Sequence, residues 1–187
     1  MARTPSNMLA LGTPAPDFRL MDTITGRDMS LKELKGKNGT VVMFICNHCP
    51  FVKHVNPEIS ILAREFQPRN IRFIAISSND VEHYPEDSPE MMKATALKMG
   101  YTFPYLYDSD QKAAKAYDAA CTPDFYLFNA DLSLVYRGQL DDSRPGNGIS
   151  LTGDDLRNAI KALLHGEPIN EVQKPSIGCN IKWKAAP

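Results

Sequence analysis

Two things that the chain lacks limit its partners: a long apolar segment and an excess of charge. No stretch approaches the length of a membrane span, and the first 18 residues carry Arg3 but no apolar segment of the kind that secretory signals contain. The 21 basic and 22 acidic side chains give a net charge of −1, which provides no overall attraction for nucleic acid or anionic membranes. We therefore expect neither nucleic acid nor a membrane as a partner.

Internal repeats, low-complexity tracts and an interdomain linker are also absent, and cysteine is scarce. The 187 residues suit one domain with a full core, so we expect a single domain over 1–187, with a core of about 10–165 and a C-terminal tail, 166–187. Four cysteines without a secretory signal indicate a reducing compartment, and we expect the protein to be cytoplasmic. In that compartment a closely spaced cysteine pair is more often catalytic than structural.

The central feature that is present is the stretch 41–54, in which two cysteines follow a short apolar run. The first five residues predict a buried strand. Pro50 is well placed as the first residue of a helix, because its missing N–H would have no partner there. Cys46 and Cys49 should then lie at a helix N-terminus, where free amides and the macrodipole favour a thiolate. The pair therefore predicts redox chemistry that needs no cofactor, since the sulfurs carry the electrons.

Two other interpretations of Cys46 and Cys49 remain open. A C-x-x-C is also half of a zinc site, but Cys121 and Cys179 form no second C-x-x-C. A smaller site made of the pair and a nearby histidine would still suit Cu(I) or Zn(II), because thiolate and imidazole are soft ligands. The two cysteines would otherwise be buried structural thiols.

Apolar strands alternate with helical patterns along the rest of the chain. A Thr25–Gly26 turn predicts an N-terminal hairpin, and Asn56–Pro57 predicts a kink or restart in the helix after the cysteines. Thr152 is expected to cap the last helix. Strands are predicted at 41–45, 71–77, 103–107, 125–128 and 134–136, with helices at 89–99, 110–117 and up to 164. This order predicts an α/β fold, with a central mixed β-sheet and helices on both faces.

Three motifs together resemble a known family. They are Gly12-x-x-Ala15-Pro16-Asp17-Phe18-x-Leu20, a strand ending in C-x-x-C, and Thr122-Pro123 ahead of a strand. The combination resembles the thioredoxin-fold redoxins, which include the alkyl hydroperoxide reductase/thiol-specific antioxidant branch and the thiol-disulfide oxidoreductases related to cytochrome maturation. The resemblance covers about residues 10–165. The run Cys-Asn-His-Cys-Pro-Phe-Val-Lys-His also resembles a bacterial subgroup of thioredoxin-like proteins.

The resemblance implies a thioredoxin fold and a thiol-disulfide oxidoreductase. Cys46 would be the attacking thiolate and Cys49 the resolving thiol of a mixed disulfide. Since Cys46 should lie nearer the solvent, we expect it to have the lower pKa. Pro123 would be a cis-proline facing the pair, and Thr122 would offer backbone groups to a substrate chain. The partners implied are a protein or small-molecule disulfide or thiol, an unknown reductant and, as an open expectation, a second copy in a homodimer.

Departures from the family pattern bear on an alternative function, an antioxidant thiol peroxidase. Thioredoxin's tryptophan before the first cysteine is Ile45 here, and its Gly-Pro is Asn47-His48. The peroxiredoxin motif P-x-x-x-T-x-x-C is missing, because Met43 stands three residues before Cys46. The arginine of many peroxiredoxins is replaced by Thr122-Pro123. These departures favour disulfide exchange over the peroxidase.

Three residues near the pair are further candidates. His48 is expected to stabilise the thiolate of the reduced form when protonated, which would make the disulfide more oxidising. Asn47 is the one nearby side chain that would offer a donor to a peroxide. Lys53, two helical turns beyond Cys46, either faces the same end of the helix or is a solvated cation.

The other two cysteines have less defined expectations. Cys121 lies two residues before Pro123, so its backbone should come near the pair, and it is either a third, resolving thiol or a buried inert one. Cys179 lies in the tail, where it would be a free thiol, a partner of Cys121 or a contact between two copies.

Overall fold

The computed structural model describes residues 3–185 and shows an α/β protein with a central sheet. The α-helices are α1 (Leu31–Leu34), α2 (Pro50–Phe66), α3 (Pro89–Met99), α4 (Lys112–Ala116) and α5 (Asp154–His165), and the 3-10 helices are η1 (Gln67–Arg69) and η2 (Pro85–Asp87). The strands are β1 (Thr4–Pro5), β2 (Arg19–Asp22), β3 (Asp28–Ser30), β4 (Gly39–Phe44), β5 (Ile71–Ser77), β6 (Tyr105–Tyr107), β7 (Cys121–Thr122), β8 (Asp124–Asn129), β9 (Leu134–Gly138) and β10 (Ile177–Asn180).

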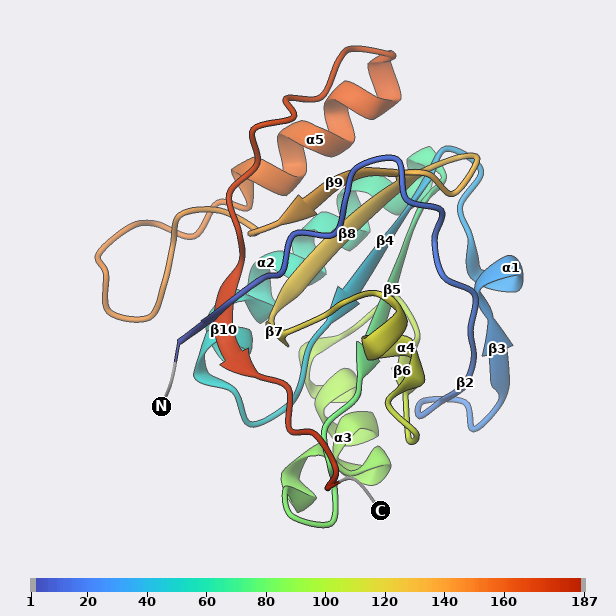
Figure 1. The fold of residues 1–187 in the computed structure, drawn as a ribbon, viewed down its shortest axis with the longest axis vertical. Helices are drawn as coiled ribbons and strands as arrows, with labels where there is room; N and C mark the ends of the chain where they lie inside the picture. The colour runs from blue at the N-terminus through green and yellow to red at the C-terminus, as the bar shows by residue number, and fades with distance from the viewer. Residues whose placement is uncertain (1–2, 186–187) are drawn as a thin grey trace.

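The central sheet has seven strands in the order β3-β2-β6-β5-β4-β8-β9. β4 and β6 both run parallel to β5, because α2 and α3 carry the chain back between them, whereas the other neighbours are antiparallel. The N-terminal hairpin β2–β3 forms one edge, and the late hairpin β8–β9 forms the other (Figure 1). The predicted mixed sheet with an N-terminal hairpin extension is therefore confirmed.

Helices cover both faces of this sheet, as the sequence predicted. Successive side chains of a strand point to opposite faces, and β4 shows this alternation inside the core. Val41 and Met43 belong to an apolar cluster that also holds buried residues of α2, α3 and α5. Val42 and Phe44 belong to a second cluster, which contains buried residues of α1 and α4. The central strand is thus buried on both sides and is held firmly where it delivers the cysteines.

A second, smaller sheet joins three distant parts of the chain in the order β1-β10-β7. β10 lies in the tail and pairs antiparallel with β1 of the N-terminal arm and with β7, just before Pro123. In Figure 1 the tail (red) and the N-terminal arm (blue) run side by side past β7. The sequence predicted a C-terminal tail, but no pattern in it indicated that the tail and the N-terminal arm form strands at this place.

At Asn56–Pro57 one of the two predicted alternatives, the restart, is excluded, and the prediction for Thr152 is wrong. The helix after the cysteines does not restart at Asn56–Pro57, since α2 is continuous from Pro50 to Phe66. Its second half is held by buried side chains, including Glu58, which forms an ion pair with Arg157 of α5. Thr152 does not cap α5, because the cap position is Gly153, whose backbone is left-handed with φ of 68°. None of the helices described between residues 3 and 185 is both long and apolar enough to cross a membrane.

Candidate active site

Cys46 and Cys49 lie at the start of α2, directly after the central strand, where the sequence places them. Cys49 is the N-cap residue of α2 and Pro50 its first residue. Cys46 is 2% exposed and Cys49 is 0% exposed, so both sulfurs are buried. All four cysteines of the chain are thiols in this structure rather than disulfides. The site is therefore described in its reduced form.

Thr122 and Pro123 face the two cysteines, as the resemblance implied. The Thr122–Pro123 peptide bond is cis. The Thr122 hydroxyl oxygen lies 3.3 Å from Cys46 Sγ, and the Thr122 carbonyl oxygen lies 3.3 Å from Cys49 Sγ. One residue ahead of the cis-proline thus contacts both sulfurs.

The hydrogen bonds around the pair favour a thiolate on Cys49. As a thiol, Cys49 donates to the Thr122 carbonyl and to Cys179 Sγ. When Cys49 is a thiolate, hydrogen bonds from Cys46, from the Cys179 side chain and from the amides of Val52 and Cys179 lower its pKa to about 5 despite its burial. The hydrogen bond to Cys49, followed by burial and the charge of Asp87, raises the pKa of Cys46. Our expectation that Cys46 has the lower pKa is thus corrected, because the donors converge on the inner sulfur.

A buried aspartate, Asp87, organises the loop between the cysteines. Asp87 is 0% exposed, and its Oδ2 lies 2.6 Å from His48 Nδ1. A carboxylate only accepts hydrogen bonds, so Nδ1 is the donor and the ring orientation is fixed. Asp87 also accepts hydrogen bonds from the Asn47 amide, at 2.7 Å, and from the Asn79 side chain, at 2.7 Å. Sequence reasoning missed Asp87, since it lies 39 residues beyond His48 in a polar loop without a motif.

The structure gives Asn47 and Lys53 positions that do not support a role beside the sulfurs. The Asn47 amide group donates to the Glu86 carbonyl at 2.8 Å and accepts from the Tyr105 hydroxyl at 3.2 Å. These hydrogen bonds hold the loop to its neighbours, so Asn47 is a positioning residue. Lys53 is exposed to solvent on α2.

The third thiol at the pair is Cys179, and not Cys121. Cys179 Sγ lies 2.7 Å from Cys49 Sγ, although the two residues are 130 positions apart in the chain. The Cys121 thiol instead donates to the Pro123 carbonyl, at 3.7 Å. Burial raises the pKa of Cys121, followed by the charge of Asp124, which disfavours its thiolate. No pattern in the sequence indicated the approach of Cys179, because this approach depends on the pairing of β10 with β7.

A candidate metal site within residues 3–185 consists of Cys46, His48 and Asp87, which each offer a ligand atom within 4.8 Å of the others. Cys49, which the metal hypothesis included, is not a member. The Asp87 carboxylate already accepts four hydrogen bonds from Asn47, His48 and Asn79. A metal would have to displace some of them, and the carboxylate is a harder ligand than Cu(I) prefers.

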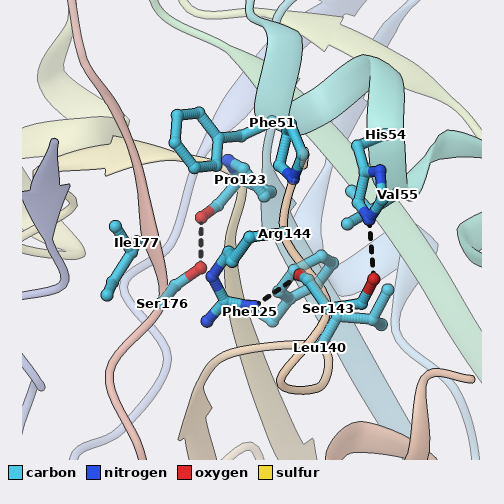
Figure 2. Close-up of a pocket in the computed structure, with 11 residues that line it drawn as sticks. Phe51, His54, Val55, Pro123, Phe125, Leu140, Ser143, Arg144, Ser176 and Ile177 are labelled. Carbon is cyan, nitrogen blue, oxygen red and sulfur yellow. Dashed lines mark hydrogen bonds between the residues drawn. The ribbon is translucent and has the colours of Figure 1, made fainter. Parts of the chain in front are cut away.

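A small pocket lies beside Pro123 and is shown in Figure 2. Phe51 and Val55 of α2 contribute apolar walls, and His54 closes one side through a 2.7 Å hydrogen bond between its Nε2 and the Ser143 hydroxyl. Ser176, just ahead of β10, donates to the Pro123 carbonyl at 2.5 Å. The pocket thus places apolar surface next to the cis-proline.

A mixed sheet, a cysteine at each end of the turn into α2 and a facing cis-proline are the features of a thioredoxin-like redoxin. Comparison of the sequence with known families agrees with this class. The chain belongs to the AhpC/TSA family, whose sequence model matches residues 11–137. The family and the fold that the motifs suggested are therefore confirmed, and the chain is an oxidoreductase.

Three similar proteins show how far the likeness extends. The crystal structure of an uncharacterized conserved protein from Geobacillus kaustophilus is 59% identical, with a TM-score of 0.98 over 100% of this chain and 99% of that one. Thiol-disulfide oxidoreductase ResA from Geobacillus thermodenitrificans is 25% identical over 86% of this chain and 82% of its own length. The thioredoxin domain of a thiol-disulfide oxidoreductase from Bacteroides vulgatus shares the fold, with 19% identity and a TM-score of 0.65 over 83% of this chain and 99% of that one.

Proposed function

We propose that this protein is a thiol-disulfide oxidoreductase in which Cys46 and Cys49 alternate between a dithiol and a disulfide. The observation that carries the proposal is that both sulfurs lie at the start of α2 and contact Thr122, the residue before the cis-proline. The names of relatives such as ResA support the same class of reaction. The substrate is a protein or small-molecule disulfide, and a dithiol donor returns the pair to its reduced form.

Cys46 is the nucleophile of the first step. β10 covers Cys49 through Cys179, whereas Cys46 keeps a small exposed fraction. The hydrogen bond between the two cysteines lets Cys46 pass its proton to the Cys49 thiolate as it attacks a substrate sulfur. One substrate thiolate leaves and a mixed disulfide forms. Cys49 then loses its proton, attacks Cys46 Sγ and releases the second substrate thiolate. In the mixed disulfide Cys46 no longer has a proton to donate, but the amides of Val52 and Cys179 still donate to Cys49 and favour its thiolate for this step.

The pocket beside Pro123 has room for about one water molecule, so a substrate would contact its rim and not fill it. Strand-like pairing with Thr122, which the resemblance implied, conflicts with the tail, because β10 already pairs with β7 there. Ile177 of β10 and Phe125 of β8 line the pocket beside Pro123 together with Phe51 and His54 of α2 (Figure 2). The substrate therefore approaches over the α2 side of Pro123, where it contacts Phe51, and does not pair with β7.

A peroxidase would need donors that polarise the O–O bond and stabilise the developing charge. The side chains that hydrogen-bond to Cys46 within the described chain are Cys49 and Thr122. Asn47, the other donor that the sequence offered, is engaged by Glu86 and Tyr105. We therefore expect hydrogen peroxide to react with the pair no faster than with an ordinary thiolate of similar pKa.

The test combines insulin reduction with a trap. The wild-type chain with dithiothreitol should accelerate insulin reduction, Cys46→Ser should abolish the acceleration, and Cys121→Ser should retain it. Cys49→Ser should hold a disulfide substrate covalently on Cys46, as mass mapping would show. Rapid peroxide consumption that depends on Cys46, without insulin reduction, would establish the peroxidase instead. Stoichiometric copper or zinc in protein purified without added metal would favour the metal-binding alternative.

A further inference from the structure

Cys179 is held against Cys49 by a strand that has little freedom to move. β10 pairs with β1 on one side and with β7 on the other, and Cys179 lies opposite Thr122 in the register. Gly178 approaches the Thr122 carbonyl so closely that a Cβ at this position would lie 1.9 Å from the oxygen. Only a residue without a side chain allows this approach, so the backbone fixes the position of the neighbouring thiol.

Cys49 contacts both of the other sulfurs of the site. Cys46 donates a hydrogen bond to Cys49, and Cys179 Sγ lies 2.7 Å from Cys49 Sγ. A disulfide bond is about 2.05 Å long, so a small shift of one side chain would close a bond between Cys49 and Cys179. Cys179 is itself 2% exposed, so exchange with Cys49 would take place without solvent or a large rearrangement.

We propose that Cys179 is a third redox-active thiol of this site, which exchanges with the Cys46–Cys49 disulfide to give a Cys49–Cys179 disulfide. The inference rests on the proposed function, since the Cys46–Cys49 disulfide must form first. The Cys179 sulfur loses its proton and attacks Cys49 Sγ, the Cys46–Cys49 bond breaks, and the bonding pair leaves on Cys46. The proton released by Cys179 passes to Cys46, so no external oxidant or reductant takes part.

The exchange changes which sulfur the next substrate meets. Once the oxidised pair is Cys49–Cys179, Cys46 is again a thiol and can attack a second disulfide. The tail occupies the edge of β7 where a substrate strand would pair, and it presents a cysteine to the pair as such a substrate would. The external donor must then reduce a bond that joins α2 to the tail.

The Cys46→Ser variant of the full chain tests the proposal, because it keeps three of the four cysteines and cannot form the Cys46–Cys49 bond. The reduced variant is treated with one equivalent of diamide, its thiols are counted in denaturant, and its disulfide peptides are mapped by mass spectrometry. We expect the count to fall from three to one, with a bridge between Cys49 and Cys179 in a monomeric chain. The unaltered protein, partly oxidised, should contain both this bridge and Cys46–Cys49.

Two double variants serve as matched controls. Cys46→Ser with Cys121→Ser should still lose both remaining thiols, whereas Cys46→Ser with Cys179→Ser should keep both, and far-ultraviolet circular dichroism checks that each is folded. The inference alone is overturned if the unaltered protein reduces insulin and forms Cys46–Cys49 while Cys46→Ser keeps all three thiols or bridges through Cys121. An unaltered protein that neither reduces insulin nor forms Cys46–Cys49 overturns the proposed function instead.

Discussion

At the scale of single residues, the reactivity of the cysteine pair depends on the Asp87 carboxylate, although this group has no hydrogen bond to either sulfur in the described chain. The charge of Asp87 is one of the causes that raise the pKa of Cys46. His48 donates a hydrogen bond to the same carboxylate and stacks on Tyr84, with the ring centroids 5.5 Å apart. The sequence suggested that His48 acts on the thiolate directly, and the geometry adds a route through Asp87.

This arrangement predicts that two substitutions shift the redox potential in opposite directions. His48→Phe keeps the stacked ring but removes the donor to Asp87, so the carboxylate charge disfavours the thiolate more and the potential should fall. Asp87→Asn removes the charge, so the potential should rise. Tens of millivolts are expected, since about 30 mV corresponds to 1.4 kcal/mol for a two-electron couple. Equilibration with dithiothreitol buffers, followed by alkylation, measures both. Shifts of the same sign would rule out this route.

At the scale of elements, β10 is the strand on which the third thiol depends. Gly178→Ala should force it away from β7, because the new Cβ would meet the Thr122 carbonyl. Overpacking of this kind costs about 1–3 kcal/mol, which urea denaturation would measure. Cys49 should also react faster with iodoacetamide, since Cys179 would no longer cover it. Val172→Ala is the matched control in the same tail, because Val172 is 87% exposed. Equal stability of Gly178→Ala and the unaltered protein would show that the tail adapts.

At the scale of the whole molecule, a buried acid ties the N-terminal arm to the central sheet. Asp124, the residue after the cis-proline, is 0% exposed and accepts hydrogen bonds from Ser6, at 2.7 Å, and Tyr126, at 3.0 Å. Burial raises its pKa to about 7. Between about pH 4 and pH 7 the protonated form is therefore preferred in the folded protein, and the carboxylate in the unfolded chain.

The stability of the whole chain should consequently depend on the pH through Asp124. Its contribution is fully present below the unfolded pKa of about 3.9, declines as the pH rises, and is lost above about 7. The difference between the folded pKa of about 7 and the unfolded value of about 3.9 corresponds to at most about 4 kcal/mol of unfolding free energy. Asp124→Asn should flatten this decline, because the amide stays neutral. Urea denaturation of both proteins between pH 4 and 8 would measure the difference, and parallel profiles would exclude Asp124 as the cause.

The cytoplasmic location and the homodimer stay predictions.

The sequence by itself determined the fold and the centre of the site, because both depend on local patterns. The apolar run before Cys46 and Pro50 after Cys49 suffice to place two thiols between a buried strand and a helix. The alternation of strands and helices predicts the mixed sheet, and the resemblance supplied Pro123. Each of these signals lies within a few neighbouring residues.

Only the tertiary structure decided which sulfur has the lower pKa, what positions His48 and where the tail lies. Asp87 and Cys179 reach the pair across 39 and 130 positions, respectively, and no periodicity in the sequence encodes contacts of that range. β10 is four residues long, too short for an alternating pattern to stand out. A pKa depends on the donors and charges that converge on an atom, so it becomes defined only when distant segments are packed around that atom.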